Sequence, residues 1–179
     1  MSESVRLIVN IMMKGDKRMD RQMRRKKQEL SFIECEEILR QETSGVLALA
    51  GNDKLPYAVP ISYVYDGQNL YFHCAKSGHK LDILRENSNV SFCVIAQDDI
   101  VPEKYTTLYR SVIVFGKMEI ITDDEEKRLT IEELAIKYHP LDTMEGREKE
   151  IEKDWDYFYM LKMIPEKISG KKSIELVNK

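Results

Sequence analysis

Two strand-like runs joined by an Asp66-Gly67 pair are the feature that most constrains how this chain can fold. Residues 57–65 and 69–74 are rich in β-branched and aromatic side chains. An Asp-Gly pair between two such runs is a strong signal for a β-hairpin. Further strands are predicted over residues 46–50, 89–96, 109–121 and 155–164. Six strands linked mostly by hairpins favour a mainly β chain, a small antiparallel barrel with helices, over a doubly wound parallel sheet.

Helices are predicted between and after these strands. Ser31 and Glu34 have the spacing of a capping box that opens a short helix, and Thr122 and Glu125 repeat that spacing before a second one. Helical periodicity also covers residues 77–87 and 143–153, whereas residues 97–108 are polar and predict a loop. Gly116 inside a β-branched run predicts a bulge or a close backbone approach.

The composition excludes several classes of protein. The chain has 179 residues, 42% of them hydrophobic and 33% charged, which is typical of one globular domain. No apolar run reaches the roughly 20 residues of a membrane-spanning helix, so no membrane span is predicted. The short apolar stretch near the N-terminus is followed by a basic run, which is unlike a secretory signal. Three cysteines without a CxxC pair fit a reducing compartment, and we expect a cytoplasmic protein.

Charge divides the chain into two regions. Residues 1–27 carry 9 basic and 3 acidic side chains, whereas the remainder carries a net charge of −9. We therefore expect a basic, partly ordered arm over residues 1–27 and one folded domain over residues 28–179. The acidic domain argues against binding to nucleic acid, because phosphate backbones need an accumulated positive field. The arm could still act as a nucleic-acid tether.

The segment 71–80 is the most informative for chemistry. A strand ends, a turn of small residues follows, and a helix begins near Ser77, His79 and Lys80. Free backbone N–H groups and the positive end of the helix dipole make such a terminus suitable for a phosphate monoester. The alternative is an ordinary capped helix with a solvated lysine.

Other kinds of site receive little support. His73 and His79 lie on different predicted elements, without the spacing of a metal site, so no metal is predicted. Cys74 follows His73 in a strand, so the two side chains point to opposite faces and form no nucleophilic pair. Neither a dinucleotide fingerprint nor a P-loop is present. The aromatic residues around Trp155 fit a core and dimer contact, or a wall that stacks on a planar ring.

Three strings, taken in order, resemble a known family. They are PYAVPISY at residues 56–63, YFHCAKSGHK at 71–80 and YRSVIVFGK at 109–117, with MRRKK at 23–27 and ISGK at 168–171 in support. Together they resemble the FMN-binding split-barrel proteins related to pyridoxamine 5′-phosphate oxidase, most closely the 5-nitroimidazole-resistance branch. The resemblance implies a six-stranded antiparallel split barrel of the FMN-binding type. It also implies a homodimer with FMN in the cleft between its subunits.

The resemblance also implies which residues contact FMN. The strand from Ala58 to Ser62 would follow the flavin ring, largely through its backbone. His73 is the expected proton donor or substrate contact, and so the expected catalytic residue. His79 replaces the arginine of the oxidases, and Ser111 stands where they have a glutamine. The full cofactor-binding set is Ala58, Val59, Pro60, Ile61, Ser62, His73, Cys74, Ser77, His79, Lys80, Ser111 and Trp155.

The expected activity follows from the same resemblance. It implies an FMN-dependent oxidoreductase that reduces nitroimidazoles or similar small planar substrates. A flavin-binding carrier or stress protein without turnover is the first alternative. Oxidation of pyridoxamine phosphate is the second, although it needs a further Arg and Lys cluster near the C-terminus that we do not find. F420 or haem in place of FMN also stays open, as does the electron donor.

Overall fold

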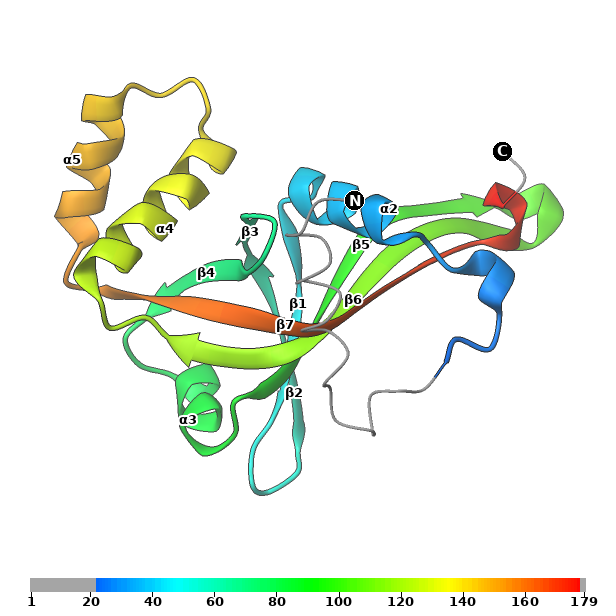
Figure 1. Ribbon diagram of the computed structural model, residues 1–179, viewed down its shortest axis with the longest axis horizontal. Helices are drawn as coiled ribbons and strands as arrows, with labels where there is room; N and C mark the ends of the chain where they lie inside the picture. The colour runs from blue at the N-terminus through cyan, green and yellow to red at the C-terminus, as the bar shows by residue number, and fades with distance from the viewer. Residues whose placement is uncertain (1–21, 178–179) are drawn as a thin grey trace, which may run out of the picture.

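A computed structural model describes residues 22–177, and it shows one antiparallel sheet of seven strands in the order β2-β1-β5-β6-β7-β4-β3 (Figure 1). The strands are β1 (Ser44–Ala50), β2 (Pro56–Ser62), β3 (Val64–Tyr65), β4 (Leu70–Ala75), β5 (Asn89–Val101), β6 (Thr106–Ile120) and β7 (Phe158–Lys172). The helices are α2 (Phe32–Gln41), α3 (His79–Glu86), α4 (Asp124–Tyr138) and α5 (Met144–Asp154), with 3₁₀ turns η2 (Lys26–Gln28), η3 (Pro102–Lys104) and η4 (Ile174–Leu176).

The sheet curls until its two ends approach each other. Cα atoms of β2 and β4 come within 8 Å, although no ladder joins these strands among residues 22–177. The barrel is therefore split at this seam, which confirms the predicted fold class. Register shifts between Ile95 and Gln97 and between Phe115 and Gly116 bend the long strands, as bulges do at the corners of barrels.

The structure has seven strands rather than six because the predicted strand 57–65 breaks at Tyr63. Its first part, β2, pairs with β1, whereas Val64 and Tyr65 pair with β4. At the break, the Tyr63 N–H donates to the carbonyl of Thr43 and to the hydroxyl of Tyr138. The chain thus passes from one end of the sheet to the other within three residues.

The predicted loop over residues 97–108 is wrong. Cross-strand pairs continue from Gln97 with Arg110 to Val101 with Thr106, so β5 and β6 form a long hairpin. The 3₁₀ turn η3 and Tyr105, with a φ of 49°, close it. Both faces of this hairpin carry polar or exposed side chains, and the hydrophobic alternation that signals a strand is therefore missing.

Gly116 confirms the predicted close backbone approach. A Cβ at this position would overlap the carbonyl oxygen of Ile164 on β7, so only glycine fits beside the bulge. The last strand was predicted over residues 155–164, but α5 continues to Asp154 and β7 begins at Phe158. Trp155 therefore lies at the joint between helix and strand.

Aromatic rings fill the middle of the barrel. Tyr63, Phe72 and Phe92 are fully buried, and the ring of Phe92 meets the other two edge-on at centroid distances of 4.9 and 5.1 Å. Such pairs add to the stabilisation from buried area. Helix α2 covers one opening of the barrel and buries Cys35, Ile38 and Leu39.

Helix starts follow the side chains that cap them. The Ser31 hydroxyl accepts from the Glu34 N–H at 3.3 Å, and the Glu34 carboxylate accepts from the Ser31 N–H at 2.8 Å, which confirms the first capping box. That backbone N–H, together with the ammonium of Lys172, lowers the pKa of Glu34 to about 2. The second box is wrong: Asp123, not Thr122, caps α4 by accepting from the Glu126 N–H.

Helices α4 and α5 form a hairpin that projects beside the ends of β4 and β7 (Figure 1). Lys137 and Tyr138 hold the C-terminal end of α4 against the barrel. The Lys137 ammonium donates to the carbonyl of Glu42 at 2.5 Å, and the Tyr138 hydroxyl donates to the carbonyl of Thr43. No helix within the described range is long and apolar enough to cross a membrane.

Candidate functional site

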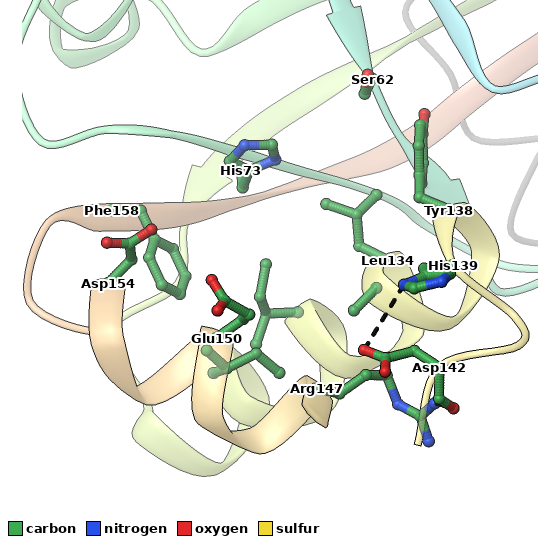
Figure 2. A pocket seen from close by; sticks show the side chains of 13 residues that line it. Ser62, His73, Leu134, Tyr138, His139, Asp142, Arg147, Glu150, Asp154 and Phe158 are labelled. Carbon is green, nitrogen blue, oxygen red and sulfur yellow. Dashed lines mark hydrogen bonds and ion pairs between the residues drawn. The ribbon is translucent and has the colours of Figure 1, made fainter. Parts of the chain in front are cut away.

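A cavity of about 440 Å³ lies between this helical hairpin and the ends of β2 and β4 (Figure 2). Ser62 comes from β2 and His73 from β4, so the cavity lies beside the seam of the split barrel. The remaining lining comes from the two helices, their connection and the start of β7: Ile131, Leu134, Ala135, Tyr138, His139, Asp142, Arg147, Glu150, Ile151, Asp154 and Phe158.

The pleat of β4 aims His73 at the cavity. Its neighbours Phe72 and Cys74 are buried in the barrel core, so His73 must point to the opposite face. The predicted alternation of Cys74 and His73 is thus confirmed. Burial raises the pKa of the Cys74 thiol, which keeps it protonated and unreactive at neutral pH.

The His73 imidazole is neutral near pH 7. The His73 side chain is exposed on one side, but the surrounding protein atoms remove much of the water from its ring. This desolvation lowers the pKa of the imidazole, and the positive charge of Lys80 lowers it further.

The start of α3, on the far side of the same turn, is an open helix N-terminus. Gly78 occupies the N-cap with a φ of 128°, and no side chain of the described residues caps the helix. The N–H groups of Leu81 and Asp82 bind the Gly78 carbonyl, which leaves those of His79 and Lys80 without a partner among residues 22–177. A Cβ on Gly78 would meet no heavy atom of the described part of the chain within 4 Å, so a ligand can approach this backbone.

This terminus fits a phosphate monoester. Two N–H groups, the helix dipole and the nearby Lys80 provide the positive field that such a group needs. Ser77 is exposed beside it but does not cap the helix. The His79 ring packs edge-on against Tyr57 of β2, with centroids 4.8 Å apart. His79 therefore joins the start of α3 to the strand expected along the flavin ring.

Strand β2 presents two kinds of side chain. Val59 and Ile61 pack against the core, whereas Ala58 and Pro60 are exposed on the other face. Because β2 is the last strand of the sheet formed by residues 22–177, its second edge is unpaired within that range, and proline is tolerated there. A flat ring could therefore approach β2 without displacing any large side chain.

Of the twelve predicted site residues, Ser62 and His73 line this cavity, whereas Ser111 lies far from it along the sheet. Ser111 pairs with Lys171, and His73 pairs with Met160. Met160 and Lys171 are eleven residues apart on β7, which is roughly 35 Å of extended strand. Within one chain, Ser111 therefore cannot reach a ligand held at His73.

Trp155 packs against Lys127 and Phe158. The Lys127 ammonium donates to its carbonyl at 2.6 Å and lies 3.9 Å from the centre of its ring. The ring packs edge-on against Phe158 at 5.9 Å. Trp155 does not line the cavity, whereas Phe158 does. It supports the cavity wall from behind rather than forming it.

The helical side of the cavity was missed by sequence reasoning. Tyr138, Arg147, Glu150, Asp154 and Phe158 all line it. The four-residue spacing of Glu150 and Asp154 places them on one face of a helix, but nothing in the sequence says what that face meets. The His139 ring nitrogen Nδ1 lies 3.7 Å from the Asp142 carboxylate at the cavity edge.

Comparison with known proteins supports the fold. The family model described as pyridoxamine 5′-phosphate oxidase matches residues 33–172. No curated protein matches the chain in sequence.

Several solved structures share the architecture. A proposed 5-nitroimidazole antibiotic resistance protein from Bacteroides thetaiotaomicron is 22% identical, with a TM-score of 0.68 over 80% of this chain and 86% of its own. A FAD-binding protein from Mesorhizobium loti is 25% identical, with a TM-score of 0.59 over 81% and 95%. A conserved hypothetical protein from Mycobacterium tuberculosis is 19% identical, with a TM-score of 0.74 over 87% and 92%.

Proposed function

Because the chain belongs to the pyridoxamine 5′-phosphate oxidase family, we propose that it is an FMN-dependent oxidoreductase that reduces nitro compounds or similar small planar substrates. The observation that carries this proposal is the juxtaposition at the turn between β4 and α3. On one side of this turn is a neutral histidine at the wall of a cavity, and on the other is an open helix N-terminus. The first suits proton transfer, and the second suits a phosphate.

The residues around this turn would hold FMN by its two ends. The backbone N–H groups of His79 and Lys80, with the Lys80 ammonium, would bind the phosphate. The exposed face of β2, with Ala58 and Pro60, would lie along the ring. The bound flavin would supply electrons to the substrate. Similarity to proteins named for FAD binding and nitroimidazole resistance supports this reading.

His73 would move protons at one of its ring nitrogens. Since its pKa is lowered, the imidazole is neutral at pH 7 and holds an extra proton only transiently. It can therefore take a proton from solvent at the cavity mouth and pass it to a reduced substrate. The apolar wall of Leu134, Ile151 and Phe158 would hold the substrate body and exclude water.

A homodimer would complete the site. We define the outer sheet face by four exposed apolar residues on three adjacent strands: Val46, Ile95, Ile113 and Phe115. Val46 and Ile113 both pair with Cys93, so they lie in one row. A contiguous apolar face of this kind marks a protein–protein interface. Ser111 lies on the same face of β6, so a second subunit could bring its own Ser111 to the cofactor.

The first test is the visible absorption spectrum of the purified protein before and after addition of FMN and desalting. We expect flavin absorption bands and release of FMN on denaturation. We also expect a 5-nitroimidazole to reoxidise the reduced protein under anaerobic conditions. Retention of flavin without reoxidation by any nitro compound would favour a carrier or stress protein. Turnover of pyridoxamine phosphate would favour the oxidase reading. A protein that retains no flavin contradicts the proposal.

The role of His73 is tested by His73→Ala. This variant should keep FMN and lower turnover by roughly 10²-fold or more, as loss of a proton-transferring group does. His139→Ala is the matched control, because this histidine lines the same cavity at its outer edge. Equal turnover of the His73→Ala variant and the unmodified protein would rule out a proton-transfer role.

A further inference from the structure

We propose that the cavity selects substrates that carry a positive charge, and that Glu150 and Asp154 determine this specificity. This inference rests on the proposed function, since it concerns the same cavity. It does not follow from the phosphate site or from His73. It follows from the distribution of charge over the helical wall.

Glu150 and Asp154 face the cavity from one side of α5. They are four residues apart and so lie on consecutive turns. Figure 2 shows both carboxylates directed from the helix toward the strands, with His73 opposite and Phe158 beside Asp154. A substrate that touches His73 therefore lies against these two carboxylates.

The cations near the cavity do not neutralise this end. Arg147 turns away from it, and its guanidinium donates to the Asp142 carbonyl at 2.6 Å (Figure 2). His73 is neutral at pH 7. No hydrogen bond or ion pair within residues 22–177 engages the Asp154 carboxylate.

Two lysines remain to be considered: Lys80 acts on His73 from across the turn between β4 and α3, and Lys153 pairs with Glu150 at 3.1 Å. Both side chains of this pair are about two-thirds exposed, at 65% and 66%. Exposed pairs of this kind are weak and screened, so the Glu150 carboxylate stays available to a second cation. The Glu150 and Asp154 carboxylates therefore line the cavity opposite His73, with Lys153 as a weakly held, exposed cation beside them.

The whole helical hairpin extends this negative field. Residues 123–157 contain 13 acidic and 6 basic side chains, so the segment carries a net charge of −7. Charges of one sign around a cleft raise the local concentration of oppositely charged ligands and the rates at which those ligands associate. The cavity would attract cations and repel anionic substrates before contact.

The lining then defines a substrate class. Leu134, Ile151 and Phe158 offer apolar contacts to a flat or short hydrocarbon body. The carboxylates offer acceptors to an ammonium, amidinium or protonated heterocycle at one end. The predicted substrate is therefore a small planar or arylalkyl cation rather than a carboxylate or a phosphate.

The test measures binding of three redox-inactive probes of similar size: benzylamine, benzyl alcohol and benzoate. Ligand-observed NMR on the full chain, with FMN added, gives a dissociation constant for each at low and high salt. Protonated benzylamine should bind about 5- to 10-fold more tightly than benzyl alcohol at low ionic strength, and benzoate more weakly than both. High salt should reduce this preference, because the carboxylates are partly exposed.

Variants locate the effect. The double variant Glu150→Gln, Asp154→Asn should bind benzylamine and benzyl alcohol with dissociation constants within about twofold of each other, because both carboxylate charges are removed. The control is Glu145→Gln, Glu148→Gln, which removes the same charge from α5 at positions that do not line the cavity. This control should keep most of the preference for benzylamine.

Three outcomes would overturn the inference. They are equal binding of the three probes, a preference that survives in the Glu150, Asp154 variant, and an equal loss in the control variant. Because the probes need no electron transfer, this result is independent of turnover. A preference for benzylamine in a protein that retains no flavin would contradict the proposed function alone.

Discussion

His73 and Lys80 lie on either side of one turn, and they interact electrostatically across it. Burial lowers the pKa of the His73 imidazole, and the Lys80 ammonium lowers it further. The unfolded chain therefore binds a proton more readily at this residue than the folded chain does. It follows that the neutral imidazole stabilises the fold above pH 6.5, and that this stability is lost as the pH falls below it.

Lys80→Gln should raise the pKa of His73, because one of its two causes is removed. Burial remains, so the pKa should stay below the ordinary value of a histidine. An NMR titration of the imidazole measures the change without reference to activity. Lys76→Gln is the control, since this lysine lies in the same turn and does not shift the pKa of His73. An unchanged titration in the Lys80 variant would contradict the electrostatic account.

Tyr138→Phe should loosen the end of α4. The hydroxyl accepts from the Tyr63 N–H at 3.1 Å and donates to the Thr43 carbonyl, so both bonds are lost. We expect a loss of about 1–2 kcal/mol in the free energy of unfolding by urea. Tyr157→Phe removes a hydroxyl from an exposed ring and should change little. Equal effects of the two substitutions would show that the bonds of Tyr138 contribute nothing.

Gly116→Ala should strain the ladder between β6 and β7. The new methyl group would overlap the Ile164 carbonyl, and backbone cannot move aside as easily as a side chain. The expected loss is about 1–3 kcal/mol or more, measured by denaturant unfolding. The new methyl group of Gly51→Ala would come closest to the end of the Glu86 side chain, at 3.2 Å, and would contact no backbone atom among its three nearest neighbours, so it should cost less. The opposite ranking would contradict the role given to the bulge.

Ile113→Asp should disrupt the proposed dimer. A charge in the centre of the outer sheet face would be buried without a partner on association. Sedimentation should show dimers for the unmodified protein and monomers for the variant. Leu129→Asp alters an exposed leucine on α4, outside that face, and should remain dimeric. A monomeric unmodified protein would contradict the dimer directly.

Local signals in the sequence predicted much of the fold. The hairpin at Asp66-Gly67 joins β3 and β4, the capping box at Ser31 starts α2, and Gly116 lies at a bulge. Each depends on neighbours within a few residues. The break at Tyr63 could not be predicted, because the Thr43 and Tyr138 groups that bind its N–H are distant in sequence. The polar hairpin at residues 97–108 was missed because its strands lack a buried face.

In the candidate site, too, the parts that depend on neighbouring residues were predicted and the parts that depend on distant packing were not. The sequence placed His73 at a strand end and an open helix terminus after it, and both are present. The arm over residues 1–27 lies mostly outside the described residues. The helical wall of the cavity depends on how α4 and α5 pack against β4 and β7, which periodicity does not encode. The contact of Trp155 with the flavin was implied by the resemblance and stays a prediction; the structure places this residue at the joint between α5 and β7.

The separation of Ser111 from His73 along β7 has a consequence for dimers that combine two different variants. If each site takes His73 from one subunit and Ser111 from the other, a dimer of one His73→Ala subunit and one Ser111→Trp subunit carries both lesions in one site and none in the other. If the two inactive variants are unfolded, mixed and refolded together, activity would then return. Random pairing makes such mixed dimers about half of the population, each with one intact centre, so about a quarter of the original activity should return.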